Sequence, residues 1–242
     1  MRRPVTFLVL LACALLVPAA AAQALNVYAA ASLREALPRI APARFNFAGS
    51  NQLQLQIERG APADVFASAE PTEARALFRQ GRCTRPVTFA TNRLVLVVPS
   101  RNRAGIRSAY SLRRGRLRIS VGTAGVPIGA YTRRLLARMR LSSVLRSNAV
   151  SQEPNVAGVL SKVALGSADA GFVYHTDALA ARGRVRELAL PRWAQPPVRY
   201  HACVVRRRGG DGAGGNAFLR RLTSTPGRRV LRRYGFGLPP RG

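Results

Sequence analysis

The chain has 242 residues, 48% of them hydrophobic, which is enough to bury a large core in one big domain or in two lobes. Lysine and arginine outnumber aspartate and glutamate by 39 to 10, which gives a formal charge of +29. The arginines are scattered over every segment in short runs, without an aromatic-interleaved basic block. We therefore interpret the charge as a solvated basic surface and not as a dedicated nucleic-acid face, and we keep a basic polyanion-binding protein as an alternative.

Residues 1–24 have the pattern of a secretory signal peptide, because two arginines precede the apolar run Val5–Val17 and small residues follow it. This run is too short for a membrane-spanning helix ahead of a soluble domain. An alternative is that Leu10–Cys13 acts as a lipobox, which would make Cys13 a lipidated anchor. Because the apolar run continues past Cys13 into a cleavage site, we favour cleavage and a periplasmic or extracytoplasmic protein.

Two cysteines, Cys83 and Cys203, remain once the signal peptide is removed. In an oxidising compartment two cysteines are expected to form one disulfide, although the sequence alone does not show that they meet.

The mature chain begins with the stretch NVYAAASL, residues 26–33. It predicts a short strand, a run of small residues and a helix start at Ser32. Glu35 stands three residues later, the spacing of a capping box. A serine at a helix N-terminus also offers an anion a hydroxyl, free N–H groups and the positive end of the helix dipole. From this segment alone, capping is the preferred interpretation.

The same order of strand, small residue, serine and helix then recurs. Arg44–Ala48 alternates like a strand, and Ser50 opens a helix that Gly60 ends. A third unit follows, with a strand at Val65–Ala67 and a helix that begins at Pro71. Three strand–helix units in a row predict a parallel sheet.

A near-continuous apolar run, Asn92–Pro99, is typical of a strand buried on both faces. The polar, arginine-rich stretch Ser100–Gly115 predicts a loop with one helical turn. Its composition indicates the first crossing into a second lobe, and a long surface loop within one domain is the alternative. Beyond it we predict strands at Arg116–Val121, Ser147–Val150, Asp169–Tyr174 and Val198–Val205, and helices after Pro127, after Asn155, at Ala217–Ser224 and at Gly227–Tyr234.

Catalytic chemistry has few candidates in this chain. The two histidines, His175 and His201, match no metal or triad pattern, and the ten acidic residues have no paired spacing. What recurs instead is a set of strand ends that lead into helix starts, at Ser32, Ser50, Val126–Ile128 and Asn155–Val156. Ligands bind at the carboxyl ends of strands in open α/β sheets. These helix starts could surround an anion with N–H groups and hydroxyls, or they could be ordinary capped helices.

With these residues the chain resembles the periplasmic molybdate-binding proteins of bacterial ABC transporters, which are type II periplasmic solute-binding proteins. The resemblance extends from about Leu25 to Phe236. It rests on NVYAAASL (26–33), FAGSNQLQLQIERGAPADVFASA (47–69), NRLVLVVP (92–99), VPIGAY (126–131), EPNV (153–156), AGFVY with TDA (170–178) and RRYGF (232–236). It implies an α/β protein of two lobes, each a mainly parallel sheet flanked by helices, joined by a hinge. Residues 25–92 and 199–242 would form lobe I, and residues 93–198 lobe II.

The resemblance also implies a site. Hydroxyl donors fall on Ser32 and Ser50, backbone N–H donors on Ile128 and Val156, and a phenolic hydroxyl on Tyr174. The implied ligand is molybdate or tungstate, bound as the oxyanion without catalysis, without a cofactor and without metal-cation ligands. The implied partner is a membrane permease, and we expect a monomer that has no specific nucleic-acid partner. A receptor for another oxyanion, such as sulfate, is the alternative.

Two departures from the family pattern bear on this site. The segment Leu33–Phe47 is shorter than usual, which predicts a reduced wall of lobe I. Position 128 is isoleucine where a smaller residue is usual, which predicts a tighter pocket.

Overall fold

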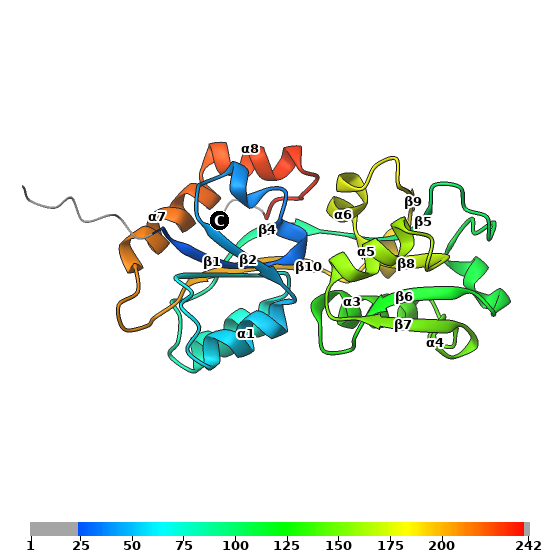
Figure 1. The fold of residues 1–242 in the computed structure, drawn as a ribbon, viewed down its shortest axis with the longest axis horizontal. Helices are drawn as coiled ribbons and strands as arrows, with labels where there is room; N and C mark the ends of the chain where they lie inside the picture. Colours follow the sequence, from blue (N-terminus) through cyan, green and yellow to red (C-terminus); the bar gives the residue numbers. More distant parts are fainter. Residues whose placement is uncertain (1–23, 240–242) are drawn as a thin grey trace, which may run out of the picture.

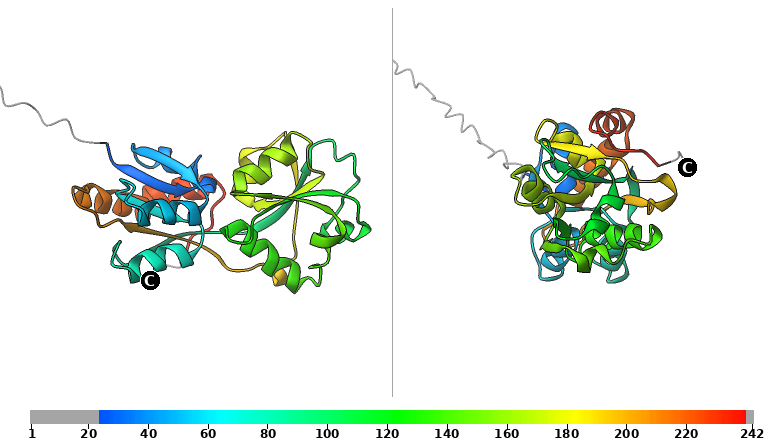
Figure 2. Two further views of the ribbon diagram at one scale, coloured as in Figure 1. Left: turned by 60° about the horizontal axis from the view of Figure 1, so that its bottom comes forward. Right: turned by 90° about the vertical axis from the view of Figure 1, so that its right-hand side faces the viewer.

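The computed structural model describes residues 24–239, which form two lobes, each built on a five-stranded sheet with helices on both faces (Figures 1 and 2). The predicted two-lobed α/β fold is therefore confirmed. The predicted signal peptide, apart from its last residue, and the alternative lipid anchor at Cys13 lie outside the described residues.

The first sheet contains the N-terminal strands and one strand from late in the chain. Strand β1 is parallel to β2 and β3, as the repeated strand–helix units predict, whereas β10 runs antiparallel to β3 and β4. The late strand thus ties the end of the chain into the sheet that the beginning forms. The order is β2 (Arg44–Ala48), β1 (Asn26–Ala30), β3 (Val65–Ser68), β10 (Val198–Val204) and β4 (Val87–Asn92).

The second sheet is built in the same way. Strand β6 is parallel to β7 and β8, and β5 is antiparallel to β8 and β9. Strand β5 covers most of the apolar run Asn92–Pro99 that is predicted to be one buried strand, and its first five residues are fully buried. The first two residues of the predicted strand differ, because Asn92 ends β4 and Arg93 is exposed between the two strands. The order is β7 (Ala149–Glu153), β6 (Arg118–Gly122), β8 (Ala170–Tyr174), β5 (Leu94–Pro99) and β9 (Val185–Leu188).

The chain crosses between the sheets at Arg93, which separates β4 from β5, and returns between β9 and β10. The prediction that Ser100–Gly115 marks the first crossing was therefore wrong. That segment lies within the second lobe, where it contains the 3-10 helix η3 (Ala109–Arg114). Its polar composition reflects exposure to solvent and not a boundary between lobes.

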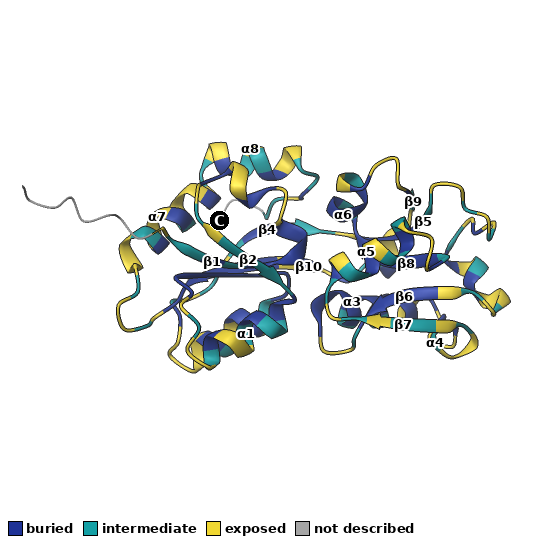
Figure 3. Cartoon of the chain, viewed as in Figure 1, coloured by how far each residue is buried: buried dark blue, intermediate teal, exposed yellow. Residues whose placement is uncertain are grey.

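Helices cover both faces of each sheet, and their outward sides are exposed while the central strands are buried (Figure 3). None of the helices within residues 24–239 has both the length and the apolar character needed to cross a membrane. The first lobe carries α1 (Ser50–Glu58), α2 (Pro71–Arg79), α7 (Gly212–Thr223), α8 (Thr225–Arg233), η1 (Ala31–Leu33) and η2 (Leu37–Arg39). The second carries α3 (Pro127–Arg138), α4 (Val144–Ser147), α5 (Val156–Ala164) and α6 (His175–Ala180), and η4 (Arg192–Ala194) lies on the return to β10.

The shortened segment after Ser32 forms only η1 and η2. Proline at 38 prevents a continuous α-helix, because proline lacks an N–H and its ring clashes with the preceding turn. The segment still packs, since Leu33, Leu37 and Ile40 are buried in the main core.

Cys83 and Cys203 lie together in a second core cluster beneath α1 and α2. Both are buried free thiols in this structure. A hydrogen bond that the Cys203 thiol donates to Cys83, together with burial, raises the pKa of Cys203. The predicted disulfide stays a prediction, which intact mass before and after reduction tests.

Candidate functional site

A small cavity lies between the two lobes, where strand ends of both sheets lead into helix starts. The centre of a water-sized sphere can move within a volume of about 20 Å³ in this cavity. The cavity therefore admits a compact ligand of a few heavy atoms. None of the lining side chains is charged. The lining residues are Ala30, Ala31, Ser32, Ala48, Gly49, Ser50, Ala69, Val126, Pro127, Ile128, Asn155, Val156 and Tyr174.

Ser32 lies inside η1 and is not its cap. The cap position is Ala30, and it has no side-chain cap hydrogen bond, so the predicted capping box of Ser32 and Glu35 is wrong. The helix starts before the serine and is only three residues long, which leaves the hydroxyl available for other contacts. Ser32 Oγ lies 2.8 Å from the hydroxyl of Tyr200 and lines the cavity.

Ser50 is the first residue of α1, and Gly49 holds the cap position. The prediction that Ser50 caps this helix is therefore wrong by one residue. Its Oγ accepts a hydrogen bond of 3.1 Å from the N–H of Ala69. Because the oxygen serves as the acceptor there, the hydroxyl hydrogen remains available to a ligand in the cavity.

The second lobe faces these serines with two helix N-termini. Ile128 is the second residue of α3, and Val156 is the first residue of α5. The N–H groups at such positions have no partner within their own helix. Asn155 caps α5 by accepting from the N–H of Gly158 at 3.1 Å. Unpaired N–H groups and the positive ends of two helix dipoles therefore meet at the cavity.

The isoleucine at position 128 fits because of a glycine in the neighbouring strand. A Cβ placed on Gly122 would lie 2.6 Å from Ile128 Cγ2. The Ile128 side chain therefore occupies the space that a side chain at position 122 would need. Glycine at 122 thus makes room for the larger residue at the start of α3.

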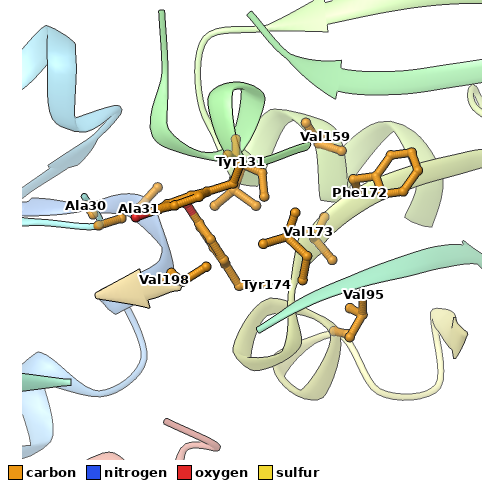
Figure 4. Close-up of a cluster of buried hydrophobic side chains, with 14 of the residues drawn as sticks. Ala30, Ala31, Val95, Tyr131, Val159, Phe172, Val173, Tyr174 and Val198 are labelled. Atoms are coloured by element: carbon orange, nitrogen blue, oxygen red, sulfur yellow. The ribbon is translucent and has the colours of Figure 1, made fainter. Parts of the chain in front are cut away.

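Tyr174 ends β8 and is 1% exposed (Figure 4). Within residues 24–239 its hydroxyl has no hydrogen-bond partner, although it lines the cavity. Buried hydroxyls almost always have a partner. Burial raises the pKa of Tyr174 well above its ordinary value, so the hydroxyl stays protonated and can donate. This unpaired donor is the feature of the cavity that most directly indicates a missing acceptor.

The substitution Tyr174→Phe separates a ligand donor from a packing residue. We expect it to weaken binding of molybdate, the ligand that the resemblance implies, by roughly 10- to 100-fold, because a hydrogen bond to an anion is lost. The ligand-free protein should be as stable as the parent or slightly more stable, since an unpaired buried hydroxyl is removed. Calorimetry and thermal unfolding measure the two effects. A large loss of stability without a loss of affinity would identify Tyr174 as a packing residue.

The lobes touch on several sides of this cavity. Glu70, which follows β3, forms an ion pair with Arg134 of α3. A Cβ on Gly49 would lie 2.6 Å from the carbonyl oxygen of Pro154 in the opposite lobe. A ligand in the cavity would therefore be enclosed by both lobes.

Five residues predicted as a site from the resemblance are brought together here: Ser32, Ser50, Ile128, Val156 and Tyr174 line one cavity. The sequence reasoning missed Gly49, whose proximity to the opposite lobe depends on how the lobes close. It also missed Tyr200, which contacts Ser32 only because β10 inserts into the first sheet. No local signal in the sequence marks either role.

Glu73, a buried carboxyl of α2, lies near the ion pair between the lobes. Ser68 Oγ is 3.0 Å from Glu73 Oε2 and 2.6 Å from the carbonyl oxygen of Glu70. The single hydroxyl hydrogen of Ser68 serves only one of these acceptors at a time, so an ionised Glu73 is poorly compensated. Burial is the main cause that raises the pKa of Glu73 to about 7.

This pKa predicts a pH dependence of stability. Between the unperturbed value of 4.5 and about 7 the folded state binds more protons than the unfolded state, so the free energy of unfolding falls as the pH rises through this window. We expect Glu73→Gln to reduce this fall by roughly 2–3 kcal/mol. Burial also raises the pKa of Asp177 to about 7, so the free energy of unfolding of the variant should still fall with rising pH, but less steeply. Urea unfolding of the ligand-free protein from pH 4 to 8 measures it, and parallel profiles for parent and variant would contradict the assignment.

Over residues 24–239, no group of three or more histidine, cysteine or acidic side chains is arranged to hold a metal ion. The cavity itself presents hydroxyls, N–H groups and apolar side chains, a donor set that suits an anion.

Known proteins are similar to this chain in sequence and in the arrangement of the two lobes. Residues 25–237 match the model of a family described as bacterial extracellular solute-binding protein. The molybdate-binding protein of Mycobacterium tuberculosis is 36% identical over 233 residues, which cover 92% of this chain and 87% of that protein. The sequence resemblance is therefore confirmed.

Solved structures agree on the fold. The periplasmic molybdate-binding protein of Azotobacter vinelandii has a TM-score of 0.79 at 21% identity, covering 89% of this chain and all of that one. A sulfate-binding protein of Mycobacterium tuberculosis has a TM-score of 0.75 at 14% identity, covering 88% of this chain and 85% of that one. At these identities the likeness shows the fold alone, and the fold is shared by receptors for different oxyanions.

Proposed function

Because this chain belongs to the family of bacterial extracellular solute-binding proteins, we propose that it is the molybdate- or tungstate-binding component of an ABC transporter. It binds the oxyanion in the cavity between the lobes and carries out no catalysis. The observation that carries this proposal is an uncharged cavity lined by donors, in which the Tyr174 hydroxyl has no partner among the described residues.

The donor set matches the chemistry of a tetrahedral dianion. Such an ion loses its hydration on entering the cavity, and only several charge-assisted hydrogen bonds can compensate for that loss. Ser32, Ser50 and Tyr174 supply hydroxyl hydrogens, and the starts of α3 and α5 supply N–H groups. A protonated oxyanion such as hydrogenphosphate needs an acceptor as well, so we expect the cavity to reject it.

Size distinguishes the remaining oxyanions. Molybdate and tungstate are larger than sulfate and offer the same four acceptor oxygens, so hydrogen-bond chemistry hardly separates them. The identity with the molybdate-binding protein of Mycobacterium tuberculosis supports molybdate over sulfate. Sulfate is the second candidate, because a sulfate-binding protein shares the fold.

Calorimetry of the mature protein with molybdate, tungstate, sulfate and phosphate tests this proposal. We expect molybdate and tungstate to bind far more tightly than sulfate, and phosphate not to bind. Sulfate binding as tight as that of molybdate would reject the assignment. Binding of polyanions that salt abolishes, with no binding of any small oxyanion, would favour the alternative of a basic polyanion-binding protein.

In this proposal the protein acts outside the cytoplasmic membrane, after removal of residues 1–24, as a monomer without a cofactor. We assign residues 25–92 and 199–242 to lobe I and residues 93–198 to lobe II, although β10 of the first sheet already begins at Val198. Closure on the anion would present both lobes to a membrane permease. The charge of +29 favours the approach of small anions, although it provides no specific nucleic-acid face.

A further inference from the structure

Hydrogen bonds connect Ser32 through Tyr200 and Asn92 to Thr176, and none of these last three residues lines the cavity. The Ser32 hydroxyl lies 2.8 Å from the hydroxyl of Tyr200, and that hydroxyl accepts a hydrogen bond of 3.3 Å from Asn92 Nδ2. Asn92 Nδ2 also donates to Thr176 Oγ1, at 3.0 Å. Tyr200 is fully buried, and Asn92 is the last residue of β4, directly before the crossing between the lobes.

The direction of the two hydrogen bonds from Asn92 follows from one backbone contact. The N–H of Arg93 donates to Asn92 Oδ1 at 2.9 Å, and because an N–H requires an acceptor, the side-chain oxygen must face Arg93. The amide nitrogen therefore faces the other way, toward Tyr200 and Thr176. Asn92 gives one hydrogen to each of these two hydroxyl oxygens.

The Tyr200 hydroxyl thus acts as an acceptor toward Asn92. Its own hydrogen has one acceptor among the described residues, Ser32 Oγ. Burial raises the pKa of Tyr200 well above its ordinary value, so this hydrogen is always present. Once Ser32 Oγ accepts it, the hydrogen of Ser32 has to point elsewhere. Ser32 lines both the cavity between the lobes and an outer groove that Thr176 and Asp177 also line, and we assign the hydrogen to the cavity because the Ser50 and Tyr174 hydroxyls line it as well.

We propose that Tyr200, oriented by Asn92, is a positioning residue that fixes the Ser32 hydroxyl as a donor toward the bound oxyanion. This inference rests on the proposed function of the cavity. Without Tyr200 the Ser32 hydroxyl would rotate freely, and binding would have to restrict that rotation. With Tyr200 in place the donor is oriented before the anion arrives, which lowers the entropic cost of binding.

The packing around Tyr200 holds the ring in position. Its ring makes edge contacts with the rings of Phe236, Tyr174 and Phe89, at centroid distances of 5.4, 6.0 and 6.0 Å. These contacts come from both lobes, so the ring cannot swing away from Ser32 without disturbing the core. Tyr200 therefore lies against one oxyanion donor, Tyr174, and hydrogen-bonds a second, Ser32.

A double-mutant cycle with Tyr200→Phe and Ser32→Ala tests the proposal, with molybdate affinity as the readout. In the parent background we expect Tyr200→Phe to weaken binding about tenfold. In the Ser32→Ala background the same change should weaken it less than about twofold, because the oriented hydroxyl is already absent. Tyr131→Phe is the control, since it removes another buried hydroxyl beside Tyr174, at a ring distance of 6.4 Å, and its effect should be equal in both backgrounds.

Equal losses for Tyr200→Phe in both backgrounds, or no loss in either, would overturn the positioning role. If Tyr200→Phe does not fold, Asn92→Leu breaks the next link of the same chain, and its effect should vanish in the Ser32→Ala background in the same way. The proposed function fails separately: Ser32→Ala and Ser50→Ala would then leave molybdate affinity unchanged. A loss for the serine variants without any loss for Tyr200→Phe would reject only the positioning role.

Discussion

The double substitution Ser32→Ala and Ser50→Ala should lower molybdate affinity by roughly 10²- to 10⁴-fold, because it removes two hydrogen bonds to a charged ligand at about 1.5–3 kcal/mol each. Both hydroxyls line the cavity, and each oxygen already has a contact on its far side, with Tyr200 and with the N–H of Ala69. Their hydrogens are therefore directed at the ligand. Calorimetric titration with molybdate measures the loss.

Stability has to be measured beside affinity for this variant. Removal of the Ser50 hydroxyl leaves the N–H of Ala69 without its acceptor, which costs about 1–3 kcal/mol of folding free energy. Ser120→Ala is the matched control: its hydroxyl is buried and unpaired within the described residues, and it lies outside the cavity lining. This control should keep full molybdate affinity. Unchanged affinity of the double variant would reject the assigned site.

Gly49→Ala should weaken molybdate binding between about fivefold and a hundredfold, by preventing full closure of the lobes, since an overpacked contact costs about 1–3 kcal/mol. The added Cβ would lie 2.6 Å from the carbonyl oxygen of Pro154 in the opposite lobe, and backbone atoms cannot move aside as a flexible side chain does. The backbone of Gly49 is ordinary extended chain, with φ −65° and ψ 137°, so alanine introduces no backbone strain. Within its own lobe the nearest atom to the added Cβ is Asn51 Oδ1, at 3.0 Å, which belongs to a side chain that can move aside. Stability without ligand should hardly change.

The matched control for closure is Gly125→Ala, in the facing lobe. Its Cβ would have Asn51 Nδ2 as nearest neighbour, at 3.9 Å, which is an ordinary contact. Small-angle scattering with saturating molybdate should report a more open average shape for the Gly49 variant than for the Gly125 variant. Identical affinities and scattering for the two would show that the contact between Gly49 and Pro154 does not control binding.

The sequence by itself determined the architecture of each half of the chain. Small residues between a strand and a helix, proline at helix starts and glycine at helix ends are local signals. They predicted the alternation of strands and helices along the chain that the structure shows. Within the predicted run Asn92–Pro99, the burial of Leu94–Val98 was also predicted correctly. Such features depend on neighbours within a few residues, which is why they can be read from the chain.

Local patterns were less reliable for the roles of single side chains. Ser32 and Ser50 have the spacing of helix caps, but neither is one, because each helix starts one or two residues earlier than the serine pattern indicates. Their oxygens contact Tyr200 and Ala69 instead, 168 and 19 residues along the chain. The resemblance implies that both serines are ligand donors, which stays a prediction, while the spacing alone favoured caps.

The composition of the chain misplaced the first crossing between the lobes, whereas the resemblance implied a division after residue 92; only the tertiary structure decided what surrounds the cavity. The crossing at Arg93 leaves no mark in composition, because a one-residue connection between two strands needs no loop chemistry of its own. Likewise, Tyr200 meets Ser32, Gly49 meets Pro154 and Glu70 meets Arg134 only after β10 enters the first sheet and the lobes close. These contacts join residues far apart in the chain, so their partners are set by the packing of whole elements and not by any sequence pattern.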